Sequence, residues 1–223
     1  MGTLITVTAT AEERAWPELG AVHLSVGASG ADRQQVIDRT AAAHERLLAE
    51  VRRLDGEGAL EQWSAGQLRV WSQRPFNSEG RQLPVVHEAR GELELVFKDL
   101  AALSAWVSEQ AAGEELSVGG IEWRLTEATA ARVREAAQRR AVAEAVAKAT
   151  VYASALGLGS PAPVELADAG LLDARPSPMA KGGHLARAAA FGMDAASAPI
   201  AELAPAELVV QATVEARFDA SAG

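Results

Sequence analysis

The sequence predicts an α+β fold: a mainly antiparallel sheet with helices packed on one face. Apolar and polar residues alternate at period two in several separate segments, which is typical of half-buried strands. Between these segments, apolar residues recur at the spacing of amphipathic helices. From residue 22 to 125 the order is strand, helix, strand, strand, helix, strand, as in the split βαβ unit of ferredoxin-like folds. We expect such a core, extended by a third long helix and by terminal strands.

The first half of the chain supplies two strands and one helix of this arrangement. Alternation predicts a strand over 5–10 and, after a break at Trp16-Pro17-Glu18, a second over 22–26. Asp32, with Gln35 three residues later, resembles a capping box at the start of a helix that runs to about Leu54. The residues that share the apolar face predicted for this helix are Ile37, Ala41, His44, Leu48 and Val51.

The middle of the chain predicts a hairpin, a short helix and a further strand. A strand over 68–72 leads into residues 74–80, which are rich in turn formers, and the returning strand covers 85–97. Asp99 begins a short helix, and a strand over 121–125 precedes the long third helix. Asp55-Gly56-Glu57-Gly58 is expected to form a loop, and Trp63 is also expected in a loop.

The third helix, over 132–156, is rich in alanine and ends at Gly157, which supplies a left-handed C-cap. The apolar stripe that we expect to face the sheet consists of Val142, Ala145, Val146, Ala149, Ala153 and Leu156.

The last part of the chain contains two predicted strands and a long irregular segment. The strands cover 164–167 and 208–218, and the second has a clear period of two. Residues 169–199 show no period and contain several prolines and glycines, so we expect a flexible loop or an oligomer arm there. We expect residues 1–223 to form a single domain.

Composition excludes several classes of function. Hydrophobic residues make up 48% and charged residues 23%, as in an ordinary globular protein. The net charge of −9 gives no support for nucleic-acid binding. Cysteine is absent, which excludes disulfides and thiol chemistry. No stretch is long and apolar enough for a membrane helix, and MGTLITVTAT lacks the pattern of a secretory signal, so we expect a cytoplasmic protein.

Several segments together resemble the SIMPL family of bacterial proteins. The opening strand, the break at Pro17-Glu18-Leu19 and the strand 22–26 are similar to the start of that family. Residues 91–100 are similar to a family strand that ends in an acidic-leucine helix start. The best-marked stretch comprises Arg139-Arg140-Ala141, Ala145, Lys148-Ala149, Tyr152-Ala153 and Leu156-Gly157, and the closing segment comprises Pro199-Ile200 and residues 208–218. The family usually has glycines where this chain has Ala9, Ala11 and Ala206.

The resemblance implies a fold and a link with stress defence and oligomers, and it implies no particular reaction. Members of the family are linked with oxidative-stress defence and with large ring-like oligomers, and many of them are exported. The resemblance implies no catalytic residues. Because this chain lacks cysteine, a role in stress defence would have to depend on binding or assembly instead of thiol chemistry.

The residues themselves predict no catalytic or metal centre. The four histidines lack the i,i+2 or i,i+4 spacing of a compact metal site. His44 is expected to be a buried or half-buried residue with one hydrogen-bond partner, and the alternative is a ligand role. His23 and His87 are expected on strands, where they could meet across a sheet with Glu88 nearby. We therefore expect a protein that is not an enzyme and that carries no cofactor.

The candidate functional residues are aromatic. A large ring in a loop usually needs a partner surface or a ligand, although packing beneath the loop remains an alternative. The candidates for ligand binding or for an interface are Trp16, Trp63, Trp71, Phe76 and His87. The favoured function is a self-associating scaffold or binding protein, and a homo-oligomer is its expected form. The alternative is a small-molecule or peptide binding module with a pocket near the hairpin at 71–88.

Overall fold

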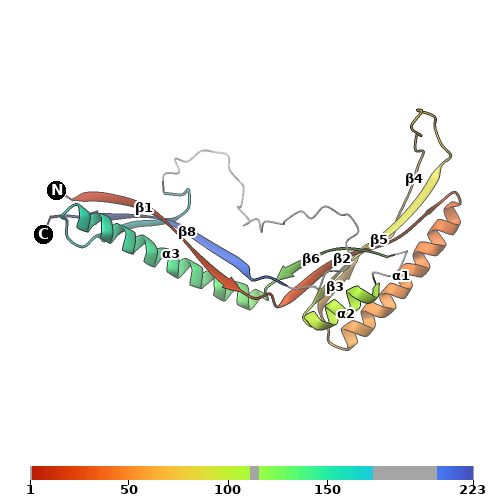
Figure 1. The fold of residues 1–223 in the computed structure, drawn as a ribbon, viewed down its shortest axis with the longest axis horizontal. Helices are drawn as coiled ribbons and strands as arrows, with labels where there is room; N and C mark the ends of the chain where they lie inside the picture. The colour runs from red at the N-terminus through yellow and green to blue at the C-terminus, as the bar shows by residue number, and fades with distance from the viewer. Residues whose placement is uncertain (1, 111–115, 173–204, 223) are drawn as a thin grey trace. The chain divides into compact units, whose positions relative to one another are not determined.

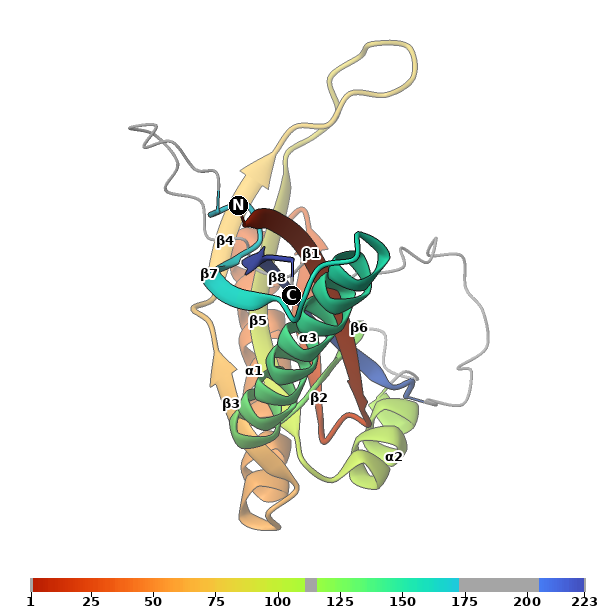
Figure 2. The same cartoon turned by 90° about the vertical axis from the view of Figure 1, so that its left-hand side faces the viewer.

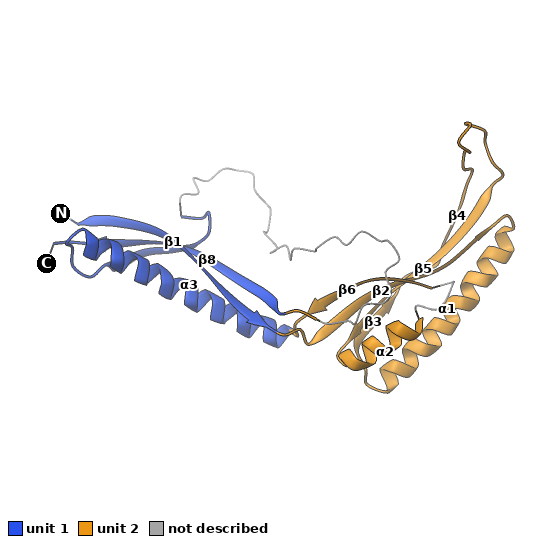
Figure 3. Cartoon of the chain, in the orientation of Figure 1, with its two compact units in different colours: residues 1–15, 127–201, 207–223 blue, residues 16–126, 202–206 orange. Residues whose placement is uncertain are grey.

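A computed structural model of the chain describes residues 2–110, 116–172 and 205–222. Within these ranges it contains three helices and eight strands, and all strand pairs are antiparallel, which confirms the α+β class (Figure 1). The chain divides into two compact units (Figure 3). Unit 1 comprises residues 1–15, 127–201 and 207–223, and unit 2 comprises 16–126 and 202–206. The expectation that residues 1–223 form a single domain stays a prediction.

Unit 2 contains the ferredoxin-like core. Its elements are β2 (Leu19–Gly30), α1 (Arg33–Gly56), β3 (Leu60–Ala65), β4 (Arg69–Gln73), β5 (Val86–Phe97), α2 (Leu100–Gln110) and β6 (Leu116–Arg124). The sheet order is β3-β5-β2-β6, in which each βαβ unit encloses one strand of the other. β3 and β4 follow one another along the same edge of β5: β3 pairs with 93–97 and β4 with 86–90.

The strand β3 lies where the sequence predicted a loop. Only Leu60 is buried in it and Trp63 is half-buried, while its other side chains are exposed. An edge strand of this kind has too few apolar residues to show a period of two in the sequence. Its pairing with β5 in the structure identifies it as a strand.

Helix α1 begins where the sequence predicted, but it buries a different face. The Asp32 carboxylate accepts hydrogen bonds from the backbone N–H groups of Gln34 and Gln35, at 2.8 and 3.0 Å. The buried residues are Val36, Thr40, Ala43, Leu47, Val51 and Leu54, so the predicted face through Ile37, Ala41, His44 and Leu48 was wrong by one position. Thr40 is buried because its hydroxyl donates to the Val36 carbonyl at 2.8 Å, which satisfies its polar atom inside the helix.

Both helices of unit 2 cover the same face of its sheet. The core joins Val22, Leu24 and Val26 of β2 and Leu93, Leu95 and Phe97 of β5 to side chains of α1 and α2. The opposite face, called here the outer face, carries alternate residues of the same strands. These include His23, Ser25, Arg90, Glu92 and Glu94, and a separate buried cluster of Leu19, Ala21 and Val96.

Unit 1 is a three-stranded sheet with one helix on it. The strands are β1 (Thr3–Ala15), β7 (Ala162–Asp168) and β8 (Leu208–Ala220), in the order β1-β8-β7. α3 (Glu127–Ala155) packs on β1 and β8 (Figure 2). The register places Ile5 opposite Phe218 and Val7 opposite Ala216, and these four side chains are buried beneath the helix. The predicted third helix and terminal strands therefore form a sheet and a core of their own.

The buried stripe of α3 is narrower than predicted and consists of small residues. Val133 and five alanines at intervals of four are buried: Ala137, Ala141, Ala145, Ala149 and Ala153. Of the predicted stripe, Val142 is only half-buried, and Val146 and Leu156 are exposed at 44% and 63%. Alanine fits where the helix lies directly on the strands, so the larger residues lie beside the line of contact.

The end of α3 has the expected glycine cap. Gly157 has φ +69°, the Leu158 N–H donates to the Ala153 carbonyl at 2.9 Å, and the Gly157 N–H donates to the Ser154 carbonyl at 3.0 Å. After β7 the described chain continues through a turn with Gly170 at φ +80°. Most of the predicted loop or arm at 169–199 lies outside the described residues.

Candidate functional site

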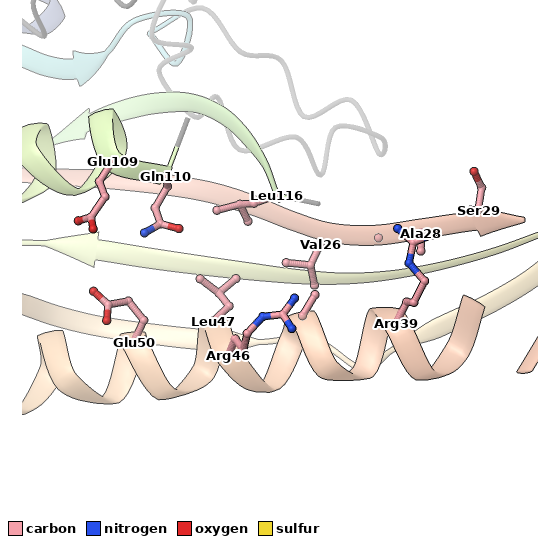
Figure 4. Close-up of a pocket in the computed structure, with 12 residues that line it drawn as sticks. Val26, Ala28, Ser29, Arg39, Arg46, Leu47, Glu50, Glu109, Gln110 and Leu116 are labelled. Carbon is pink, nitrogen blue, oxygen red and sulfur yellow. The ribbon is translucent and has the colours of Figure 1, made fainter. Parts of the chain in front are cut away.

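A hollow of about 820 Å³ lies between α1 and the end of β2 in unit 2. β6 pairs with β2 only as far as Val26, so the last residues of β2 continue beyond that neighbour. Figure 4 shows this hollow, called the α1 hollow, with Arg39, Arg46 and Glu50 of α1 on one side. Its other labelled lining residues are Val26, Ala28, Ser29, Leu47, Glu109, Gln110 and Leu116.

The charged side chains of the α1 hollow have both signs. Arg53 donates a hydrogen bond to the Glu50 carboxylate at 2.5 Å, and this bond lowers the pKa of Glu50 against the opposing effect of partial burial. The indole N–H of Trp106 faces the same carboxylate and adds a weak attraction, but it does not reach hydrogen-bond geometry. Glu50 is therefore ionised at neutral pH, and the hollow combines its charge with those of Arg39, Arg46 and Glu109.

The side chains that line the described part of the α1 hollow suit the binding of a ligand. Among the lining residues that the structure describes, Ser29 carries the only hydroxyl, and no histidine accompanies it as a base. Within the described ranges, no group of three or more His, Asp or Glu side chains is placed to hold a metal ion. Arginine and carboxylate groups at the wall of an open hollow suit ion pairs and hydrogen bonds to a polar ligand.

The sequence reasoning missed the α1 hollow because it searched for catalytic spacings. A weaker signal was present: Arg39, Arg46 and Glu50 are separated by seven and four residues, which places them along one side of a helix. These residues line a hollow because β2 extends beyond its pairing with β6. Only the strand register shows where that pairing ends.

The predicted aromatic site does not assemble around one pocket. Trp63 was expected in a loop, but it lies in β3 opposite Leu95 and packs against the core. Trp71 pairs with Glu88 and His87 with Ser72, so Trp71 and His87 point to opposite faces of the sheet. The His87 ring forms a hydrogen bond with the neighbouring strand, because its Nδ1 atom lies 2.7 Å from the Ser72 hydroxyl of β4.

The remaining candidates are exposed in connecting segments. Phe76 is 66% exposed in the loop between β4 and β5, which extends beyond the sheet in Figures 1 and 2. Trp16 is 63% exposed between β1 and β2. His23 and His87 do not meet, since His23 pairs with Glu94 and His87 with Gly30 at the far end of β2. Of the five candidates, Trp71 alone lines hollows in the described structure.

An ionic cluster lies on the outer face at the other end of this sheet. Arg124 contacts Glu94 at 3.0 Å and Glu122 at 2.6 Å. The hydrogen bond from Arg124 lowers the pKa of Glu122, and the two carboxylates raise the pKa of Arg124. These contacts tie β5 and β6 together, so the cluster has a structural role.

Unit 1 contains an unusual amount of exposed apolar surface. Nine large apolar side chains are exposed on unit 1, on α3, on the segments after it and on both faces of the sheet, and we call them together the apolar surface of unit 1: Leu4, Val146, Val151, Tyr152, Leu156, Val164, Leu166, Leu171 and Val209. Leu166 of β7 pairs with the buried Ala216 and so lies on the helix side of the sheet. Because α3 packs on β1 and β8, this side of β7 is left open, and Leu166 is 58% exposed.

The comparisons with known proteins show a family and leave the activity open. A family model named SIMPL, described as a protein of unknown function (DUF541), matches residues 5–218. Because this match spans nearly the whole chain, the chain belongs to the SIMPL family. None of the curated proteins that were compared matches it. In the described part of the chain, every helix is too short or too polar to cross a membrane.

Proposed function

For this member of the SIMPL family, we propose the function of a non-enzymatic scaffold or binding protein that associates with copies of itself through the apolar surface of unit 1. One observation carries the proposal. Of the thirteen large hydrophobic side chains exposed in the described residues, nine belong to unit 1. Interfaces between protein copies bury large apolar side chains of this kind.

The two parts of this surface suit one another across two copies. In each copy, β7 presents Val164 and Leu166, at 60% and 58% exposure, beside the helix that covers its neighbours. In each copy, α3 presents Val151 in its last turns and Leu156 follows directly after the helix, both at 63% exposure. A two-fold association that places α3 of one copy on β7 of the other covers both parts at once, which is the self-complementarity of an isologous interface.

The edges of the sheet favour side-chain contact over strand addition. Lys148 of α3 donates to the Thr8 carbonyl at 3.0 Å, on the long edge strand β1. A lysine at a sheet edge discourages pairing with another strand. The opposite edge strand, β7, is short and bulged between Pro163 and Glu165, so its contribution lies in its side chains.

Light scattering after size exclusion tests this proposal on three variants. Leu166→Glu and Val151→Lys each place a charge in the apolar contact and are expected to shift the protein towards the monomer. Leu83→Glu is the control, because Leu83 is 40% exposed and belongs to unit 2, so it is not one of the residues of the proposed surface. Circular dichroism verifies that all three variants remain folded. An unchanged mass for both unit 1 variants would contradict the proposed surface.

Mixing the two charged variants separates α3–β7 contact from other modes of association. In the mixed pair, one contact joins the introduced glutamate to the introduced lysine, and the other keeps the native Val151 and Leu166. We therefore expect the mixture to associate more strongly than either variant alone. If the mixture gains nothing, the surface meets a different partner or a different part of the second copy, and the α3–β7 arrangement is wrong.

A further inference from the structure

A second hollow of unit 2 lies on the outer face of its sheet. Its volume is about 260 Å³. We call it the Trp71 hollow; it is lined by Gly66, Gln67, Arg69, Trp71, Arg90 and Glu92. All of these residues come from β4, β5 and the turn before β4.

Two arginines lie directly opposite each other in this hollow. Arg69 of β4 pairs with Arg90 of β5, so the two side chains start from neighbouring positions on the same face. Like charges directly opposite across a ladder are unfavourable. In the described structure neither guanidinium takes part in a hydrogen bond or ion pair, and the nearby Glu88 accepts a hydrogen bond from Gln73 instead. An anion held between the two arginines would remove this repulsion.

Trp71 adds a flat apolar face beside the arginine pair. It lies two residues beyond Arg69 on the same face of β4 and is 39% exposed. An indole on an open sheet face offers a stacking surface for a planar ring. Trp71 and Arg90 also line a neighbouring hollow of about 270 Å³, so the ring is accessible from more than one direction.

Charge and size narrow the class of ligand. Two arginines against Glu92 leave one net positive charge in the wall, which suits a single carboxylate better than a multiply charged anion. Arginine guanidinium groups match a carboxylate through paired hydrogen bonds. A hollow of about 260 Å³ is smaller than typical drug-sized sites, so it fits a molecule with one or two rings. Glu92 and Glu94 on the same face, with the net charge of −9, disfavour a nucleic-acid strand.

We propose that the Trp71 hollow binds a small aromatic carboxylate, whose carboxylate group bridges Arg69 and Arg90 and whose ring stacks on Trp71. This site is independent of self-association, because it belongs to unit 2 and uses none of the apolar surface of unit 1. It also differs from the α1 hollow, which lies on the helix side of the same sheet.

The first test uses four probes on the full chain. Benzoate has both the charge and the ring, benzamide lacks the charge, cyclohexanecarboxylate lacks the flat ring, and inorganic sulfate is an anion without a ring. Calorimetric titration is expected to give the tightest binding for benzoate. Benzamide binding as tightly would overturn the arginine bridge, and cyclohexanecarboxylate or sulfate binding as tightly would overturn the stacking on Trp71. No binding of benzoate would overturn the site.

The second test locates the binding by mutation. Arg69→Gln and Arg90→Gln are each expected to weaken benzoate binding about tenfold, the usual effect of losing one charge-assisted hydrogen bond. Arg52→Gln on the exposed side of α1 is the control and should bind as the unaltered chain does. If both hollow variants bind benzoate with unchanged affinity while remaining folded by circular dichroism, the proposed site is wrong.

Nuclear magnetic resonance provides a readout that does not depend on the arginine variants. The chain has five tryptophans, and the indole N–H signal that disappears in Trp71→Leu is that of Trp71. Benzoate is expected to shift this signal more than the other four. A shift confined to the other indoles would place the ligand elsewhere and overturn the proposal.

Discussion

At the scale of single residues, Gly91 shows how closely α1 lies on the sheet. Gly91 pairs with Val26 on the core side of β5, and a Cβ atom added there would lie 2.9 Å from Cδ2 of His44. His44 is half-buried, as the sequence suggested, but its Nε2 atom is buried without a hydrogen-bond partner in the described structure. The ring therefore serves as a packing group above a glycine that leaves room for it.

Replacing this glycine tests that contact. Gly91→Ala is expected to lower the free energy of unfolding by about 1–3 kcal/mol, because an inserted methyl group forces the packed ring to shift. Gly120→Ala is the matched control, since a Cβ there meets nothing within 4 Å. Urea unfolding followed by circular dichroism measures both variants. Equal midpoints for the two would show that the His44 ring moves aside without loss of stability.

Two ion-paired carboxylates predict a response to acid. Hydrogen bonds from Arg53 and Arg124 lower the pKa values of Glu50 and Glu122 below the ordinary 4.5. Carboxylates with lowered pKa values stabilise the folded state fully above that ordinary value, and this contribution is lost as the pH falls through their folded-state values. Both side chains are partly exposed, so water screens the interactions and the effect is small.

The double variant Glu50→Gln/Glu122→Gln removes both titrating groups. We expect it to be less stable than the unaltered chain at neutral pH and to lose less stability on acidification to about pH 3, where the native carboxylates become protonated. Urea midpoints at the two pH values measure the difference. An identical acid-induced loss in both proteins would show that other carboxylates govern the response.

At the scale of elements, α3 depends on the small size of its buried residues. Ala145 is fully buried against β1 and β8, whereas Ala147 on the same helix is exposed. Ala145→Leu is expected to destabilise unit 1 by about 1–3 kcal/mol, because the contact has no room for three further carbon atoms. Ala147→Leu, with the same change in helix propensity, should leave the unfolding midpoint almost unchanged. Similar midpoints for both variants would contradict close contact along the alanine stripe.

The elements that the sequence predicted well are those with a strong period or a cap. The strands β1, β2, β5 and β8 alternate clearly, and Asp32 and Gly157 mark the start of α1 and the end of α3. β3 was missed because its side chains are mostly polar. The faces of α1 and α3 were misjudged because a buried threonine and a row of alanines carry a weaker hydrophobic signal than the valines and leucines beside them.

The candidate sites were harder to predict than the fold because they depend on register. Trp71 and His87 are both near the hairpin in sequence, yet the pairing of β4 with β5 sends them to opposite faces. The same pairing brings Arg69 and Arg90 together across an interval of twenty-one positions, which no local pattern shows. Trp63 looked like a loop residue only because β3 had not been recognised.

At the scale of the whole molecule, the two units differ in the kind of surface that they expose. Unit 2 has a ferredoxin-like core with polar hollows on both faces of its sheet. Unit 1 has a thin core of small residues and carries most of the exposed large apolar side chains. Contact with a partner would remove these apolar side chains from water, which is why we propose that unit 1 mediates self-association.

Sedimentation equilibrium of the unaltered full chain at micromolar concentration tests this assignment most directly. The predicted result is a mass that is a multiple of the 223-residue monomer and that falls towards the monomer in Leu166→Glu but not in Leu83→Glu. A mass equal to the monomer across the micromolar range would contradict self-association through unit 1.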